Sequence, residues 1–217
     1  MATHTDEDFL TLAQWLSPAY PLGSFAYSHG LEAAAELGQV TDAKTLGGWL
    51  SDLLRHGGGW SDAVFLAAAH GSETAAALAI IDETCEAYAP SMERRRETEW
   101  QGTAFAGVTA SVWQMDLPLR CFPVAVGRAA RLAGLPVVLT SQMYLQGFAA
   151  NLVAAAQRLL PIGQTDAQRL IHALAPVCRA VAGDTAQGAL DQLTSTTFLS
   201  DICAMRHETQ NTRIFRT

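Results

Sequence analysis

Lysine is almost missing from this sequence, and positive charge is scarce. Lys44 is the only lysine among 217 residues, and the formal net charge is -7. Proteins that bind DNA or RNA usually present a basic patch to the phosphate backbone, and anionic membrane surfaces attract basic segments. The composition therefore predicts a protein that binds neither nucleic acid nor a membrane.

Targeting and disulfide signals are lacking as well. The opening residues MATHTDEDFL are acidic and have neither the basic start nor the apolar core of a secretory signal, and no apolar run is long enough to cross a membrane. We therefore predict a cytoplasmic protein. The cysteines form no CxxC pair, so we expect buried reduced thiols rather than a zinc site or disulfides. They are Cys85, Cys121, Cys178 and Cys203.

Catalytic and nucleotide-binding motifs are also missing. GQVTDAKT, residues 38–45, approaches a phosphate-binding loop, but Ala43 stands where the motif requires glycine and the segment before it is typical of a helix. No GxSxG elbow and no HxxxH or HExxH pair occurs. His29 and Glu32 are three residues apart on an expected helix face, where a surface hydrogen-bonded pair is favoured over a metal site. We predict no catalytic, cofactor or metal residues.

What the sequence does contain is helical patterning. Apolar residues make up 49% of the chain, alanine is abundant, and almost nothing alternates with the period of a strand. We expect an all-α protein, one domain over residues 1–217 with roughly eight to ten helices and a C-terminal docking segment at 198–217. The first expected helix begins at Asp6 or Asp8 and ends before Pro18. Further helices are expected at 31–37, from 42 to the glycines at 57–59, at 61–71, and from there to Pro90. A long helix should begin at Ser91, followed by helices at 123–135, at 137–160, and from Thr165 or Asp166 to 182.

Two segments stand out against this helical background. The segment SPAYPLGSFAYSHGLE, residues 17–32, has two prolines and Gly23 that predict a rigid turn, followed by aromatic and polar groups suited to packing or to a protein interface. The last residues, HETQNTRIFRT at 207–217, place Ile214 and Phe215 where polar, frayed residues are usual. They indicate a peptide that docks on the chain's own core or on a partner. By contrast, the mixed charges at 93–99 are interpreted as a solvated helix face.

Together these segments resemble a known family. SPAYPLGSFAYSHGLE, the PIGQT of residues 161–165 and HETQNTRIFRT are similar, in order and separation, to three motifs of the urease accessory protein UreF family. The resemblance covers the chain from about Phe9 to Thr217. Three positions depart from the family pattern: His29 stands where glutamine is frequent, Ile214 where leucine is usual, and Thr217 where serine is usual.

The resemblance implies an all-α, homodimeric accessory protein that is not an enzyme. It would join UreD (also called UreH) and the GTPase UreG on apo-urease during GTP-dependent insertion of nickel, with the tail engaging UreD. The residues that match the family motifs, and that we therefore expect to bind partners, are Tyr27, Ser28, Glu32, His207, Glu208, Arg213, Phe215 and Arg216.

Two other functions are alternatives to the role of an accessory protein. One is a direct nickel carrier, which would need a defined set of nitrogen, sulfur or carboxylate ligands. The other is a helical metal-dependent hydrolase that uses His29 and Glu32 with distant ligands such as His70 or Cys121. The scatter of the histidines disfavours the hydrolase.

Overall fold

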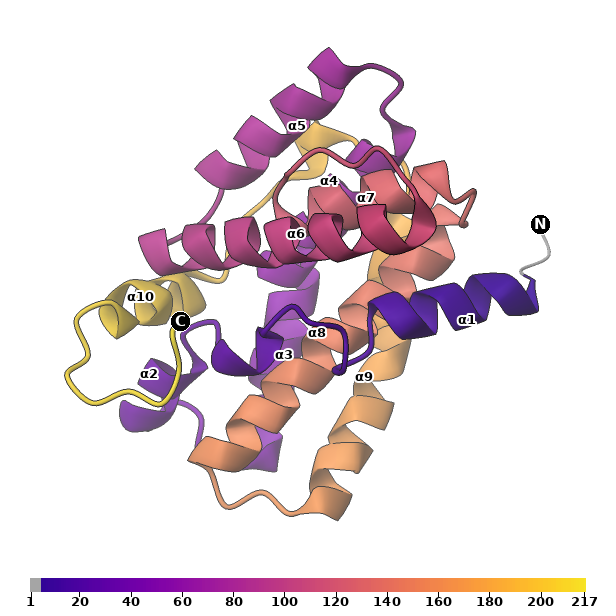
Figure 1. Ribbon diagram of the computed structural model, residues 1–217. Coiled ribbons are helices and arrows are strands. Elements are labelled where there is room, and N and C mark those ends of the chain that lie inside the picture. Colours follow the sequence, from indigo (N-terminus) through magenta and orange to yellow (C-terminus); the bar gives the residue numbers. More distant parts are fainter. Residues whose placement is uncertain (1–4) are drawn as a thin grey trace.

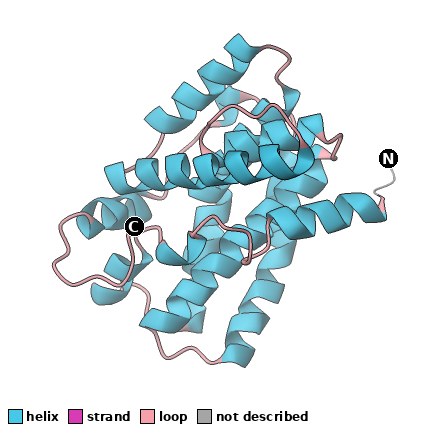
Figure 2. Ribbon diagram, viewed as in Figure 1, coloured by secondary structure: helices cyan, strands magenta, loops and turns pink. Residues whose placement is uncertain are grey.

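The protein is all-helical throughout the part that its computed structural model describes, residues 5–217 (Figures 1 and 2). This confirms the predicted fold class. Two short 3-10 helices, η1 (Ser24–Ala26) and η2 (Leu190–Gln192), connect α-helices. The α-helices are α1 (Asp6–Trp15), α2 (Leu31–Glu36), α3 (Ala43–His56), α4 (Gly58–Gly71), α5 (Ala75–Ala87), α6 (Met92–Trp113), α7 (Phe122–Leu132), α8 (Val137–Leu159), α9 (Gln164–Asp184) and α10 (Phe198–His207).

Side-chain caps set several of the helix starts that the sequence predicts. Asp42 accepts a hydrogen bond from the Thr45 backbone at 2.8 Å, while the Thr45 hydroxyl accepts one from the Asp42 backbone at 3.0 Å. This reciprocal capping box starts α3. Ser91 caps α6 in the simpler way, by accepting from the Arg94 backbone at 3.2 Å.

Other helix starts differ from the prediction by a few residues. Thr5 caps α1 in place of Asp6 or Asp8, α4 begins at Gly58 rather than at Ser61, and Gly163 rather than Thr165 or Asp166 stands at the cap of α9. Each corrected start extends the helix toward its N-terminus by a few residues, and helix ends are the least sharply defined part of a helix.

Helix α8 is the centre of the core. It packs most extensively against α9 and also contacts α4, α3, α2 and α7, so most of its surface is covered (Figure 1). Leu145 and Leu152, seven residues apart, are buried here, as the heptad spacing predicts. The remaining apolar faces of α1, α3 and α9 close around the same cluster.

Small residues let α4 and α7 approach closely. A Cβ atom added to Gly127 would lie 2.2 Å from the carbonyl oxygen of Leu66, so only glycine fits there. Gly102 on α6 is used in the same way against the carbonyl oxygen of Arg120, which such an atom would approach to 1.9 Å. The alanine and glycine content therefore serves helix packing within the chain.

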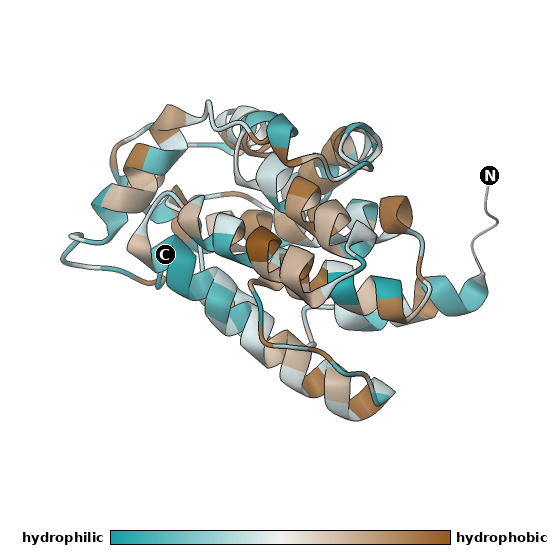
Figure 3. Cartoon of the chain, turned by 90° about the horizontal axis from the view of Figure 1, so that it is seen from above, coloured by the Kyte–Doolittle hydropathy of each residue, from teal (hydrophilic) through white to brown (hydrophobic). Residues whose placement is uncertain are grey.

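The C-terminal residues return to the start of the fold. Helix α10 packs on α2 and contacts α6, and the tail that follows it runs back across the same region (Figure 1). The hydrophilic first turns of α6 lie beside the C-terminal end of the chain (Figure 3). Across residues 5–217, no helix is both long enough and apolar enough to span a membrane.

Candidate functional site

Two consecutive residues before α2 have a left-handed backbone conformation. His29 has a φ of 55° and Gly30 a φ of 75°. A side chain at Gly30 would meet the backbone of α10, because a Cβ atom there would lie 2.6 Å from the nitrogen of Ala204. His29 therefore lies in a left-handed turn before α2 and is not part of that helix.

The tail, residues 208–217, docks on this turn through backbone hydrogen bonds. The Glu32 carboxylate accepts the N–H of Ile214 at 2.7 Å with one oxygen and the N–H of Phe215 at 2.9 Å with the other. The Arg216 N–H donates to Ala26 at 2.7 Å. The carbonyl of the last residue in turn accepts from both the backbone and the hydroxyl of Ser28. One buried carboxylate thus satisfies two tail donors.

Apolar burial accompanies these hydrogen bonds. Phe215 is only 4% exposed, and the guanidinium of Arg158 from α8 lies 4.3 Å from the centre of its ring. Burial of a phenylalanine side chain contributes about 1.5–3 kcal/mol, and a cation above the ring adds to it. Ile214 points the other way and is 56% exposed.

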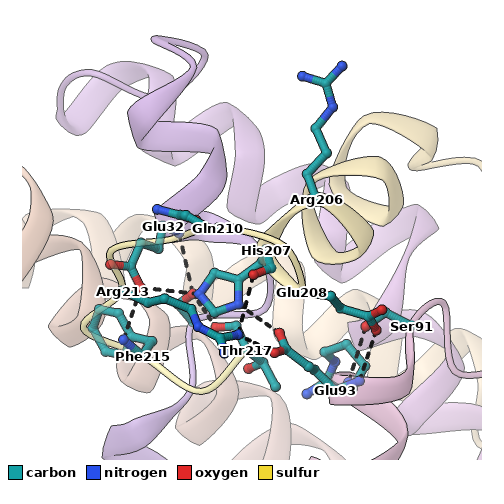
Figure 4. A network of polar contacts seen from close by, with 12 residues as sticks. Glu32, Ser91, Glu93, Arg206, His207, Glu208, Gln210, Arg213, Phe215 and Thr217 are labelled. Atoms are coloured by element: carbon teal, nitrogen blue, oxygen red, sulfur yellow. Dashed lines mark hydrogen bonds and ion pairs between the residues drawn. The ribbon is translucent and has the colours of Figure 1, made fainter.

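His207 at the end of α10 links three elements. Its side chain is fully buried, with Nδ1 2.7 Å from Glu93 on α6 and Nε2 3.2 Å from Glu32 on α2 (Figure 4). Each ring nitrogen thus faces a carboxylate from a different helix. Arg213 of the tail pairs with the second oxygen of Glu93. Glu93 is therefore shared between α10 and the tail.

Glu208 attaches the tail to the start of α6. Its carboxylate accepts the backbone N–H of Met92 at 2.7 Å and that of Glu93 at 3.2 Å (Figure 4). These N–H groups lack partners within the helix, and the positive end of the helix dipole favours a carboxylate there. Glu208 thus acts as a cap supplied from a distant part of the sequence.

Glu97 is the deepest charged group of the site. It accepts the Thr217 hydroxyl at 2.9 Å, lies 2.9 Å from the His29 ring and also pairs with Arg94. Burial alone would raise the pKa of Glu97, but Arg94 and His29 overcome this and hold it at about 2. The pKa of His29 is lowered, first by burial and then by Arg94. Glu97 thus remains ionised at any physiological pH.

We refer to this whole arrangement as the clasp: the tail held by Ser28, Glu32, Glu93, Glu97 and His207. It brings together all eight residues that the family motifs single out, although five of them are buried in this chain. The buried ones are Tyr27, Ser28, Glu32, His207 and Phe215, and the exposed ones are Glu208, Arg213 and Arg216.

The tail was expected to dock on the chain's own core or on a partner, and Phe215 packs on this chain's own Arg158. A second expectation is wrong. Glu32 was expected on a solvated surface near His29, yet it is buried and contacts His207. The reason is the left-handed turn at 29–30, which separates His29 from the face of α2 that the tail covers.

Sequence reasoning missed three charged residues and one helix. The charges at 93–99 were interpreted as a solvated face, whereas Arg94 and Glu97 are nearly buried and Glu93 is part of the clasp. Their local pattern carries no signal of burial, because an Arg94–Glu97 pair three residues apart is equally compatible with a solvated helix face, and the other partners come from residues 29 and 207–217. Helix α10 follows a polar segment and was not expected as a separate helix.

Helix α10 presents an apolar stripe to solvent. Its residues on this face are about half exposed or more, and they recur at helical spacing. Exposed apolar residues clustered in this way are typical of protein–protein contact sites. The stripe consists of Phe198, Leu199, Ile202 and Met205.

Within residues 5–217, no three or more histidine, cysteine, aspartate and glutamate side chains are grouped as a metal site would require. His70, one of the ligands considered for a metal site, instead contacts the backbone carbonyl of Leu135 at 2.9 Å. The clasp itself is built to hold the tail, since its carboxylates are already occupied by backbone, histidine and arginine donors.

Comparison with known proteins identifies the family. The UreF family model matches residues 40–175. The chain is 54% identical over 217 residues to a urease accessory protein UreF of Ruegeria pomeroyi, covering all of both proteins, and 54% identical over 212 residues to that of Ruegeria sp. (strain TM1040), covering 98% of this chain and 99% of the relative. It is also 49% identical over 209 residues to that of Roseobacter denitrificans, covering 96% of this chain and 94% of the relative. The chain therefore belongs to the UreF family of urease accessory proteins, which support urease maturation and are not enzymes.

Proposed function

We propose that this chain is the adaptor that joins UreD (UreH) and the GTPase UreG on apo-urease while nickel is inserted. The observation that carries the proposal is the pairing of an ordered clasp with an exposed apolar stripe on α10. The clasp fixes the direction of α10, and the stripe provides the hydrophobic area that a partner needs. Nickel is the cargo of the assembly, and this chain acts on it through its partners, in the cytoplasm.

The surface proposed for UreD is the segment 198–217 as it is folded here. Ile214, Arg213 and Arg216 are exposed at the tail and supply an apolar anchor beside two positive charges. Arginine and large apolar residues are enriched among interface hot spots. The buried members of the clasp take part indirectly, because they hold the exposed ones in place.

A homodimer is proposed as the working unit, with two-fold symmetry as the commonest arrangement. Gly102 does not support it, because that glycine is already used against Arg120 within the chain. Support comes instead from exposed apolar residues away from the clasp, such as Ile80 on α5 and Val112 on α6. Light scattering at micromolar concentration checks this: a mass of twice 23.2 kDa is expected, and a single monomer mass contradicts it.

The test of the adaptor role uses charges placed on the stripe. Ile202→Glu combined with Met205→Glu should leave the melting temperature of the isolated chain within about 2 °C, because both side chains are exposed. The same variant should weaken capture of purified UreD by about 10–1,000-fold and lower urease activation when all accessory proteins are supplied.

Leu132→Glu is the matched control, since Leu132 is an exposed apolar residue on α7 that belongs neither to the clasp nor to the residues proposed for the dimer. It should bind UreD like the wild type. If the α10 variant binds UreD and activates urease as well as the control does, the proposed use of α10 is wrong.

A further inference from the structure

A cavity of about 540 Å³ opens next to the clasp and is not filled by the tail. It lies between α1, the loop that follows it, α6 and α8, and its walls are mainly apolar. Small-molecule sites usually measure about 300–1,000 Å³ and combine apolar walls with a few polar groups. The apolar wall residues include Leu16, Leu22, Phe25, Met143 and Phe148.

Ionisable groups from four parts of the fold line the same cavity: Asp62 on α4, Arg94 and Glu97 on α6, Tyr144 on α8, and His29. The Tyr144 hydroxyl donates to one oxygen of Asp62 at 2.8 Å. In residues 5–217, no group donates to the other oxygen, and Asp62 forms no ion pair. One acceptor position of this carboxylate is therefore open.

The charges at the cavity do not balance. Arg94 and Glu97 pair with each other, so their charges cancel. Burial lowers the pKa of His29, which favours its neutral form. Burial raises the pKa of Asp62 to about 6, which leaves it mostly ionised above pH 7. Arg94 offsets this effect of burial on Asp62 only in part. A carboxylate among apolar walls therefore remains unfavourable, and a positively charged ligand reduces that cost.

We propose that the cavity binds a guanidinium or ammonium group carried on a short apolar chain, with Asp62 accepting its N–H groups. The apolar body of such a ligand fits against Leu22, Met143 and Phe148, and the cationic head reaches the open oxygen of Asp62. A bound metal ion fits less well, because no cluster of three metal-ligating side chains occurs in the described chain. The cation is either a free small molecule or a lysine or arginine side chain of a protein partner.

The probe for this proposal is butylguanidinium, with N-butylurea as a neutral molecule of nearly the same shape. In calorimetric titrations of the full chain at pH 7.5, butylguanidinium should bind at least about tenfold more tightly than N-butylurea. Asp62→Asn should remove that preference. Asp52→Asn, an exposed aspartate on α3, is the control and should titrate like the wild type.

A second variant tests the walls of the cavity independently of Asp62. Ala150→Leu narrows the cavity without touching Asp62, and it should weaken binding of both probes. Equal binding of the two probes to the wild type, or unchanged butylguanidinium binding by Asp62→Asn, would overturn the proposal. Binding of NiCl2 that depends on Asp62, without binding of butylguanidinium, would overturn it as well.

The two sources of the cation are separated by a capture assay with purified UreD and UreG. If Asp62→Asn loses both butylguanidinium and a partner, the natural ligand is a side chain of that partner. If it loses butylguanidinium alone, the natural ligand is a free small molecule. Because the probe titrations use the isolated chain, they stand or fall independently of the adaptor role.

Discussion

The carboxylate of Glu32 lies 2.9 Å from the backbone nitrogen of Phe215, although 183 positions separate the two residues in sequence. This contact joins α2 to the tail and excludes water from both groups, since each residue is about 5% exposed or less. A buried carboxylate that accepts two backbone N–H groups is a structural element of the fold, whatever partner the outer surface meets.

Glu32→Ala should destabilise the isolated chain. Removing the carboxylate leaves two buried N–H groups and His207 without their acceptor, which costs about 2–3 kcal/mol, or roughly 4–12 °C in melting temperature for a chain of this size. Glu36→Ala, an exposed position on the same helix, should change the melting temperature little. Equal melting temperatures for the two variants in a thermal scan would contradict the buried role of Glu32.

Neighbouring tail residues should behave in opposite ways. Phe215→Ala removes a buried ring and should cost the chain about 3 kcal/mol or release the tail from its docked position. Ile214→Ala changes an exposed side chain and should stay within about 0.5 kcal/mol, yet weaken UreD capture if this face meets the partner. Chemical denaturation beside a pull-down measures both properties. The reverse pattern would place Ile214 inside and Phe215 outside.

Glu97→Gln should be far more harmful than Glu99→Gln two residues later. The first change leaves Arg94 as an unpaired buried cation, a defect that costs about 3–5 kcal/mol. The second removes an exposed pair with Arg95, and exposed ion pairs contribute little to stability. Urea denaturation of both variants checks the difference, and similar midpoints would show that the Arg94–Glu97 pair is solvated after all.

Asp62 gives the stability of the protein a pH dependence of known sign. In the unfolded chain this carboxyl loses its proton near pH 3.8, whereas burial raises its pKa to about 6 in the folded chain. The folded state therefore binds more protons between these values, so Asp62 lowers stability as the pH rises from about 4 to 6, by up to about 3 kcal/mol.

Asp62→Asn removes this pH dependence. The stability of the variant relative to the wild type should therefore rise by the same amount between pH 4 and pH 7.5, as measured by urea denaturation. A change of the opposite sign would mean that the charge of Arg94 outweighs burial at Asp62 in the folded chain.

Local signals in the sequence predicted much of this fold. Asp42 and Ser91 mark the starts of α3 and α6 because their caps are local, needing only residues three positions away. Leu145 and Leu152 are likewise seven residues apart, a spacing typical of one helix face, and both are buried. In each case the information lies within one or two helical turns.

The clasp could be predicted only in part. The family motifs single out Glu32, His207 and Phe215, but burial of these groups depends on contacts across more than 170 residues. His29 was expected on a helix because the residues that follow it favour one. In the structure it lies in a left-handed turn with Gly30, where α10 approaches closely. Glu97 was interpreted as solvated because a local pair with Arg94 does not reveal that distant residues bury it.

The chain holds its own tail in the clasp before any partner arrives. Amide hydrogen exchange of the isolated protein tests this most directly. The N–H groups of Ile214 and Phe215 donate hydrogen bonds to Glu32, and that of Arg216 donates one to the Ala26 carbonyl. These three amides should be protected in the wild type without UreD and exchange rapidly in Glu32→Ala. Rapid exchange of all three in the wild type, with protection only after UreD is added, would contradict it.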